Sequence, residues 1–300
     1  MDLMQRYAAP CLAVMLSVGC GDPDSAGEDT DAGTDAATGS ESASTNGPTS
    51  GTNPSTDTMN DEGSSGGSSA DETTDPTDDP TGGASDCDFS EDFEGVANGD
   101  PWPSAWVPVG GVALADVQDG WGRLRPELSD YSLARMVTFI DCPEIDTSLT
   151  FMFTDQNTQG VGLYARQNGG HLRETDPTGE GYAAFAESFR DPAGIGAWRE
   201  VDGQEQRIDN TERFEIQVNV EYRMRFRLTQ VDDATSLLQG KIWPLAEAEP
   251  DAWTVERMDD TASLQGVGGA LAVDAWARDA AEGNDAADLL FDDIVSTAAR

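Results

Sequence analysis

The stretch from Gly21 to Asp86 most constrains what this chain can fold into. It contains 16 Asp or Glu residues and no Lys, Arg or aromatic residue. Such a segment cannot bury enough apolar surface to offset the entropy lost on ordering. We therefore expect residues 20–86 to form a disordered acidic tether rich in Ser, Thr, Gly and Pro, with a flexible-coil span of about 45 Å. Folded structure is then expected in residues 87–300.

A short apolar segment precedes the tether and ends at Cys20. It is too short for a membrane-spanning helix, which needs about 20 apolar residues, and is typical of a cleaved signal peptide over residues 1–19. The Gly19–Cys20 junction resembles a bacterial lipoprotein signal, in which the Cys receives fatty acids such as palmitate. Ser17 stands where that pattern has Leu, so an ordinary secretory signal is the alternative. The resemblance implies a lipid anchor in the cell envelope, and Gly21 favours the outer membrane.

Residues 87–300 have the length of one all-β domain. They carry 16 basic against 40 acidic residues. This balance argues against nucleic acid as a partner, because nucleic-acid binding depends on basic contacts to phosphates. It also argues against direct docking of the domain on anionic lipid.

Two cysteines, Cys87 and Cys142, fall within the expected domain, whereas Cys11 lies in the signal peptide. In an oxidising extracytoplasmic compartment such a pair most often forms a disulfide. Two Cys and the single His171 do not make a zinc site. We therefore predict a Cys87–Cys142 bridge.

The domain shows the two-residue periodicity of strands rather than helical periodicity. In Glu221–Leu228 the apolar side chains of Tyr222, Met224, Phe226 and Leu228 alternate with three arginines. Asp202–Gly203 is a turn signal. Similar segments occur at 133–140, 149–153, 160–166, 181–185, 197–201, 237–243, 253–258, 267–273 and 289–295. Twelve or more short strands predict an all-β, two-sheet antiparallel jelly-roll sandwich.

Short motifs occur in a characteristic order along this domain. They are Phe89–Phe93, Trp106, Gly162–Arg166, Gly181–Tyr182, Val201–Gly203, Lys241–Trp243, Pro250, Trp253 and Phe291–Ile294. This order resembles the concanavalin A-like lectin/glucanase superfamily, laminin G-like branch. The resemblance implies that the first and last strands pair, and a function in sugar binding, sugar hydrolysis or adhesion.

The hydrolase alternative rests on carboxylate pairs. Laminarinase-type members carry Glu-x-Asp-x-x-Glu, because retaining hydrolysis needs two carboxyl groups about 5 Å apart. Here Glu144 and Asp146 begin the motif but Leu149 occupies the place of the second Glu, so we interpret the segment as a strand-edge turn. His171 lies in a Gly-rich segment and is interpreted as a solvated loop residue rather than a general base. Enzyme activity is left open, with the absence of activity favoured.

Candidate ligand-binding residues follow from strand alternation and from the way sandwiches of this kind stack sugars on aromatic rings. Alternation puts Tyr164 and Arg166 on one face, and Lys241 and Trp243 on one face. With Tyr182 they would form a ligand surface if their strands are neighbours. The alternatives are core packing for Trp243 and an ion pair for Arg166.

Other aromatic and basic groups have competing interpretations. Arg223, Arg225 and Arg227 could face an anionic glycan, or form a solvated row paired with acids. Trp102, Trp106 and Trp121 are expected to cover an edge of the sandwich rather than to bind ligand.

Calcium is the ion that the resemblance implies, near the paired terminal strands. Ca²⁺ takes six to eight oxygen ligands. The candidate metal ligands are Glu91, Asp92, Asp292 and Asp293, with Asp259–Asp260 and Asp232–Asp233 as weaker pairs. Ordinary exposed carboxylates are the alternative.

The sequence thus favours a membrane-anchored extracytoplasmic lipoprotein whose domain binds carbohydrate, such as a polysaccharide, or another extracellular ligand without catalysis. The alternatives are a structural or adhesion lipoprotein that contacts proteins, and a glycoside hydrolase with an unrecognised carboxylate pair. Exposure of Tyr164, Tyr182 and Trp243 together on one sheet would distinguish the first two.

Overall fold

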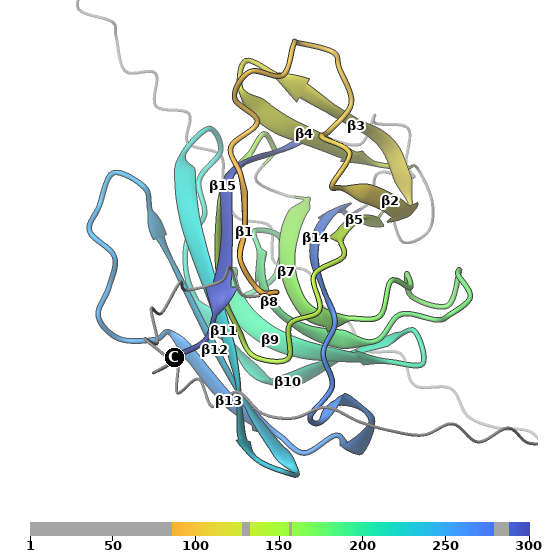
Figure 1. The fold of residues 1–300 in the computed structure, drawn as a ribbon. Coiled ribbons are helices and arrows are strands. Elements are labelled where there is room, and N and C mark those ends of the chain that lie inside the picture. The colour runs from red at the N-terminus through yellow and green to blue at the C-terminus, as the bar shows by residue number, and fades with distance from the viewer. Residues whose placement is uncertain (1–85, 128–132, 156–157, 279–287) are drawn as a thin grey trace, which may run out of the picture. The chain divides into compact units, whose positions relative to one another are not determined.

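The computed structural model describes residues 86–127, 133–155, 158–278 and 288–300. The predicted signal peptide, Cys20 and nearly all of the predicted tether lie outside these residues. The described chain is all-β and forms two antiparallel sheets packed as a sandwich, as predicted (Figure 1). No helix within the described residues is long and apolar enough to cross a membrane.

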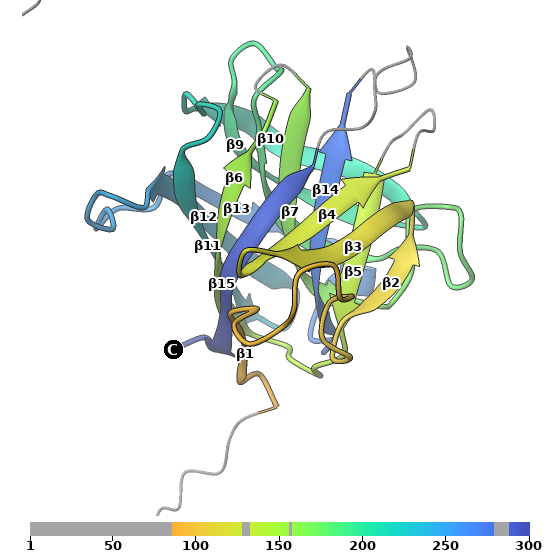
Figure 2. The same ribbon diagram turned by 90° about the horizontal axis from the view of Figure 1, so that it is seen from above.

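The first sheet has eight strands, and Figure 2 shows β15 crossing it beside β6 and β4. Its order is β13 (Val255–Asp259), β12 (Thr235–Pro244), β11 (Glu221–Asp232), β6 (Ile145–Phe153), β15 (Leu289–Ala298), β4 (Trp121–Pro126) and β3 (Val112–Gln118), with β1 (Phe89–Glu91) paired to β15. The pairing of β1 with β15 joins the first and last strands, as the resemblance implies.

The second sheet has seven strands. Its order is β10 (Gln204–Arg213), β9 (Gly194–Val201), β8 (Gly181–Glu187), β7 (Gln159–Gln167), β14 (Ala270–Ala277), β5 (Leu133–Thr138) and β2 (Val107–Gly110). A short 3-10 helix, Ala262–Leu264, precedes β14.

The core lies between the two sheets, where alternate side chains of each strand meet. On β11 the four predicted apolar residues are all buried, from Tyr222 at 3% exposure to Leu228 at 0%. The three arginines between them point outward and bond to acids: Asp146 accepts hydrogen bonds from both Arg225 and Arg227. The paired-acid interpretation of this row is confirmed.

The tryptophans of the N-terminal segment also pack in the core. Trp102 and Trp106 are about 5% exposed and meet edge to face at 5.4 Å between ring centroids. Phe93 and Phe291 pack against Trp102 in the same edge-to-face manner. These rings close the sandwich beneath the paired terminal strands.

Cys87 and Cys142 form the predicted disulfide, with an S–S distance of 2.04 Å. The bond links the start of the domain to the residues before β6. Because disulfides persist in oxidising compartments, it indicates an extracytoplasmic location.

Candidate functional site

The outer face of the seven-stranded sheet carries a second cluster of apolar side chains, separate from the core. The alternation of β7, β8, β9 and β14 turns one set of residues toward the other sheet and the next set outward. The outward set contains four large rings, which are all less than 9% exposed: Tyr164, Phe185, Trp198 and Trp276. Trp198 stacks on Phe185 at 4.3 Å and lies 5.3 Å from Trp276.

This face of the sheet is concave, because the side chain of Arg135 bonds to residues on two strands that are far apart in the order of the sheet. Arg135 on β5 donates hydrogen bonds to Asp274 on neighbouring β14 and to Glu200 on β9, both at 2.8 Å. In a flat sheet β5 and β9 would stand about 19 Å apart, at about 4.8 Å per strand. A single side chain joins them because the sheet curves around it.

Arg135 and its two carboxylate partners are completely buried. The side chains of Arg135, Asp274 and Glu200 each have 0% exposure. The guanidinium also lies 4.3 Å from the centroid of the Tyr164 ring and donates to the carbonyl of Gly170. Burial raises the pKa of the Glu200 carboxyl, and Arg135 opposes that shift. The cluster therefore fixes the centre of the concave face.

Glu205 extends this cluster toward solvent. It stands directly opposite Glu200 in the β9–β10 pairing, and its Oε1 accepts a hydrogen bond of 2.5 Å from the Tyr164 hydroxyl. Its side chain is half-buried. Burial raises the pKa of Glu205 to about 7, with Asp274 and Glu200 adding to the shift and the Tyr164 hydrogen bond opposing it. Glu205 is thus a carboxyl group that exchanges its proton near neutral pH.

A cavity of about 350 Å³ opens beside Glu205. One wall is the loop after β7 and the other is the turn between β9 and β10. Its lining residues are Leu172, Arg173, Glu174, Gly203, Gln204 and Glu205. The volume is within the range of small-molecule pockets.

The turn wall of the cavity depends on Asp202 and Gly203, the predicted turn pair. Both have positive φ, at 51° and 68°. A Cβ on Gly203 would lie 2.1 Å from the Leu172 carbonyl oxygen, so only glycine allows the loop to approach this closely. The Leu172 amide then donates to Glu200 at 2.9 Å, which ties the loop wall to the buried cluster.

His171 lies in the same loop but is not the solvated residue that was predicted. It is 1% exposed and packs against Gly110 of β2, with its Nδ1 3.1 Å from Glu174. The composition of the segment correctly indicates a loop. The prediction of solvation is wrong because this loop folds across the concave face instead of projecting from it.

The five predicted ligand residues do not gather on one surface. Tyr164 lies on the concave face. Arg166 points the other way, because β7 contains a bulge there: Arg166 has φ 53° and the register with β14 shifts by one residue. A bulge inserts one residue and ends the strict alternation on which the prediction rested. Arg166 instead donates to Ser236, Leu264 and Pro143 inside the sandwich.

Tyr182, Lys241 and Trp243 occupy other places. Tyr182 faces the core and its hydroxyl donates to Asp259 at 2.8 Å. Lys241 and Trp243 lie on the outer face of the eight-stranded sheet, opposite Arg225 and Arg223 in the β11–β12 pairing. Tyr164, Tyr182 and Trp243 are each at most 8% exposed. The expected shared surface is therefore wrong, because these strands belong to different sheets or turn different faces outward. The sugar site predicted at Tyr164, Tyr182 and Trp243 fails with it, since all three rings are buried.

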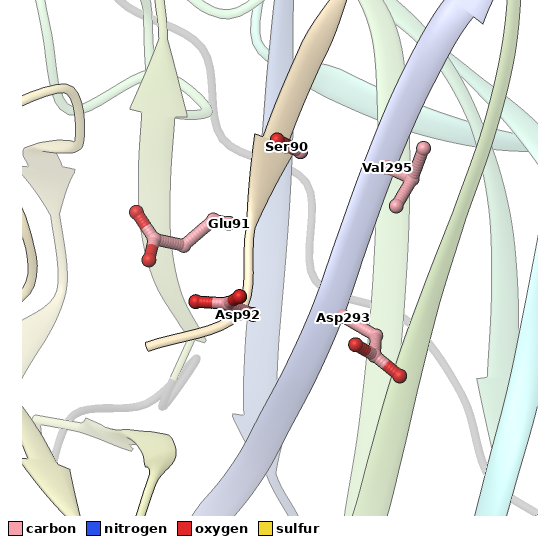
Figure 3. A pocket seen from close by; sticks show the side chains of 5 residues that line it. All are labelled: Ser90, Glu91, Asp92, Asp293 and Val295. Atoms are coloured by element: carbon pink, nitrogen blue, oxygen red, sulfur yellow. The ribbon is translucent and has the colours of Figure 1, made fainter. Parts of the chain in front are cut away.

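Three of the four candidate calcium ligands, Glu91, Asp92 and Asp293, line a cavity of about 220 Å³ near the paired terminal strands. In Figure 3 the carboxylates of Glu91 and Asp92 point to one side of β15, whereas Asp293 points to the other. Burial, with Asp293 and Asp92 adding to the effect, raises the pKa of Asp292 to about 6. Among the described residues no three His, Cys, Asp or Glu side chains are grouped to hold a metal ion. Calcium stays a prediction.

The sequence reasoning missed the residues that build the concave face. They are Arg135, Phe185, Trp198, Glu200, Glu205, Asp274 and Trp276. A signal was present, since Arg135 and Asp274 are single charged residues inside strands of otherwise small or apolar residues. A single charged residue in such a strand indicates that the face turned away from the core is also covered.

Comparison with known proteins finds no matching family model and no matching curated protein. Solved structures similar to this chain include carbohydrate binding module CBM66 from Bacillus subtilis (15% identity, 65% of this chain and 96% of the module, TM-score 0.44). Alginate lyase Aly36B is another, with 12% identity over 72% of this chain and 99% of the lyase and a TM-score of 0.49. A legume lectin-like domain from Entamoeba histolytica is also similar, with 12% identity over 65% of this chain and 90% of that domain and a TM-score of 0.43. These similarities concern the sandwich as a whole, and no residue's role is transferred from them.

Proposed function

We propose that this protein binds carbohydrate, without catalysis, at the cavity on the concave face of its seven-stranded sheet. The observation that carries the proposal is the combination of that cavity with the buried cluster beneath it. Glu205, Gln204 and Glu174 offer groups that can bond sugar hydroxyls, and Leu172 offers an apolar surface. The Tyr164 hydroxyl holds Glu205 in place, and Arg135 holds the neighbouring Glu200, so the wall of the cavity is preorganised.

Burial of the central carboxylates favours binding over hydrolysis. Glycoside hydrolysis needs two carboxyl groups that both reach the substrate. Glu200 and Glu205 are cross-strand neighbours, but Glu200 has no exposed side-chain area and is bonded to Arg135 and the Leu172 amide. Glu200 and Glu205 could therefore serve as a hydrolytic pair only if the loop after β7 moved.

We further propose that the domain is displayed on the cell envelope, on the outer membrane, by a lipid on Cys20 and the acidic segment of residues 20–86. Support comes from the signal-like sequence and from the disulfide, which suits an oxidising compartment. Cys20→Ser is expected to move the protein from the membrane fraction to the soluble fraction and to abolish labelling by a palmitate analogue. An unchanged membrane fraction would exclude the anchor.

Affinity electrophoresis of the full chain through gels that contain soluble neutral or acidic polysaccharides tests the binding proposal. Retardation by one glycan, lost in Glu205→Gln and in Gln204→Ala, is the expected result. Glu256→Gln on β13 is a matched control, because Glu256 is exposed on the other sheet. If none of the glycans retards the protein, the alternative of a structural or adhesion lipoprotein that contacts proteins is favoured. New reducing ends after incubation with the retarding glycan would establish the hydrolase.

A further inference from the structure

The chain enters the described domain through a short strand and two edge strands. The first strand, β1, has three residues and pairs with β15 alone among the described strands. The next two strands are the edges of their sheets: β2 ends the seven-stranded sheet and β3 ends the eight-stranded one. Without a cross-link, tension on the preceding chain would remove these elements one after another.

The disulfide changes the route that such tension takes. Cys87 is the second described residue, and it is bonded to Cys142, 55 positions further along the chain. Cys142 precedes β6, which lies between β11 and β15 and is hydrogen-bonded to both. Tension at Cys87 therefore passes through the disulfide to the middle of the eight-stranded sheet.

The residues around Cys142 are also fastened to the opposite sheet. The Cys142 amide donates to Gly269 at 3.1 Å, just before β14. The next residue, Pro143, accepts a hydrogen bond of 2.8 Å from Nε of Arg166 on β7. The attachment point is thus held by both layers of the sandwich.

We propose that the Cys87–Cys142 disulfide is a mechanical clamp, which delivers tension from the preceding chain to the centre of the sandwich and shields β1 to β5 from it. The shielded segment includes β5, which supplies Arg135 to the concave face. The clamp would keep that face intact while the protein is under load. This property belongs to the folded domain and does not depend on whether the domain binds carbohydrate.

Single-molecule pulling on the full chain tests the clamp. One handle is attached at the N-terminus and the other at Asp191→p-azidophenylalanine, in the exposed β8–β9 loop, so that no cysteine is added. Glu187 at the end of β8 pairs with Gly160 at the start of β7, whereas Arg166 near the end of β7 bonds to Pro143. The two attachment points are therefore at opposite ends of the sandwich, and β6 is loaded in shear along its length.

The oxidised protein is expected to unfold without an early low-force step. The Cys87→Ser/Cys142→Ser variant should first release the segment from 87 to 142 at lower force, with a gain in length of about 190 Å, at about 3.3–3.6 Å per residue. If that variant does not fold, the same low-force step should appear when dithiothreitol is added to the folded wild-type protein. Dithiothreitol should not change the traces of the double Ser variant. Equal first-step forces and lengths in the oxidised and reduced proteins would overturn the proposal.

Discussion

Replacement of Arg135 with Met should strongly destabilise the fold. The substitution keeps the apolar stem and removes the guanidinium, so Asp274 and Glu200 lose their cation at positions with 0% exposure. Removing one partner of a buried ion pair typically costs about 3–5 kcal/mol. That is a large fraction of the 5–15 kcal/mol by which domains are usually stable.

Thermal and urea unfolding of Arg135→Met at pH 7 measures this loss. For a domain of this size each kcal/mol lowers the melting temperature by about 2–4 °C, so a fall of about 6–20 °C is expected. The loss should shrink as pH falls, because burial raises the pKa of Glu200 and its protonation removes one of the unpaired charges. Adding Glu200→Gln and Asp274→Asn to Arg135→Met should recover part of the stability at pH 7.

Arg223→Met is the matched control. Arg223 pairs at 3.2 Å with Asp293, whose side chain is 52% exposed, and exposed pairs contribute about 0–1 kcal/mol. The loss in free energy of unfolding should be larger for Arg135→Met than for Arg223→Met. If it is not larger, the view that the concave face is organised around a buried ion cluster is refuted.

Three further outcomes are expected. Loss of the Cys87–Cys142 disulfide should cost about 4 kcal/mol in urea unfolding, because the bond closes a loop of 55 residues; a cost under 1 kcal/mol would contradict this. The pKa of Glu205 is raised to about 7 in the folded state, so its contribution to stability is complete below pH 4.5 and is lost as pH rises through 7. Glu205→Gln should flatten that part of the stability–pH curve, by at most about 3.5 kcal/mol for a shift of about 2.5 pKa units at about 1.4 kcal/mol per unit, and an unchanged curve would exclude the shift. Calcium at the terminal-strand carboxylates would raise the melting temperature over that in EDTA, and Asp292→Asn with Asp293→Asn would remove the rise; equal melting temperatures would exclude the ion.

Local patterns in the sequence were sufficient to predict several features of the structure. The alternation in Glu221–Leu228 predicted which side chains of β11 are buried, because strand geometry forces successive residues to opposite faces. Asp202–Gly203 predicted a turn, because glycine tolerates the positive φ that the turn requires. The two cysteines of the domain predicted their own pairing.

Local sequence patterns did not predict which residues lie together in the candidate site. The β7 bulge at Arg166 reversed the expected face of that residue, and only the register with β14 reveals it. Likewise Lys241 and Trp243 share a face as predicted, but that face belongs to the other sheet from Tyr164.

The sequence by itself determined the all-β class and the disulfide, since these depend on local periodicity and on a unique pair of residues, and the pairing of the terminal strands followed from the resemblance to a known fold. The tertiary structure alone decided that Arg135, Glu200 and Asp274 meet. They come from three strands far apart in the chain, and the curvature of the sheet brings them together. A charge that is costly to bury is tolerated there because the fold supplies its partners, which no single stretch of sequence contains.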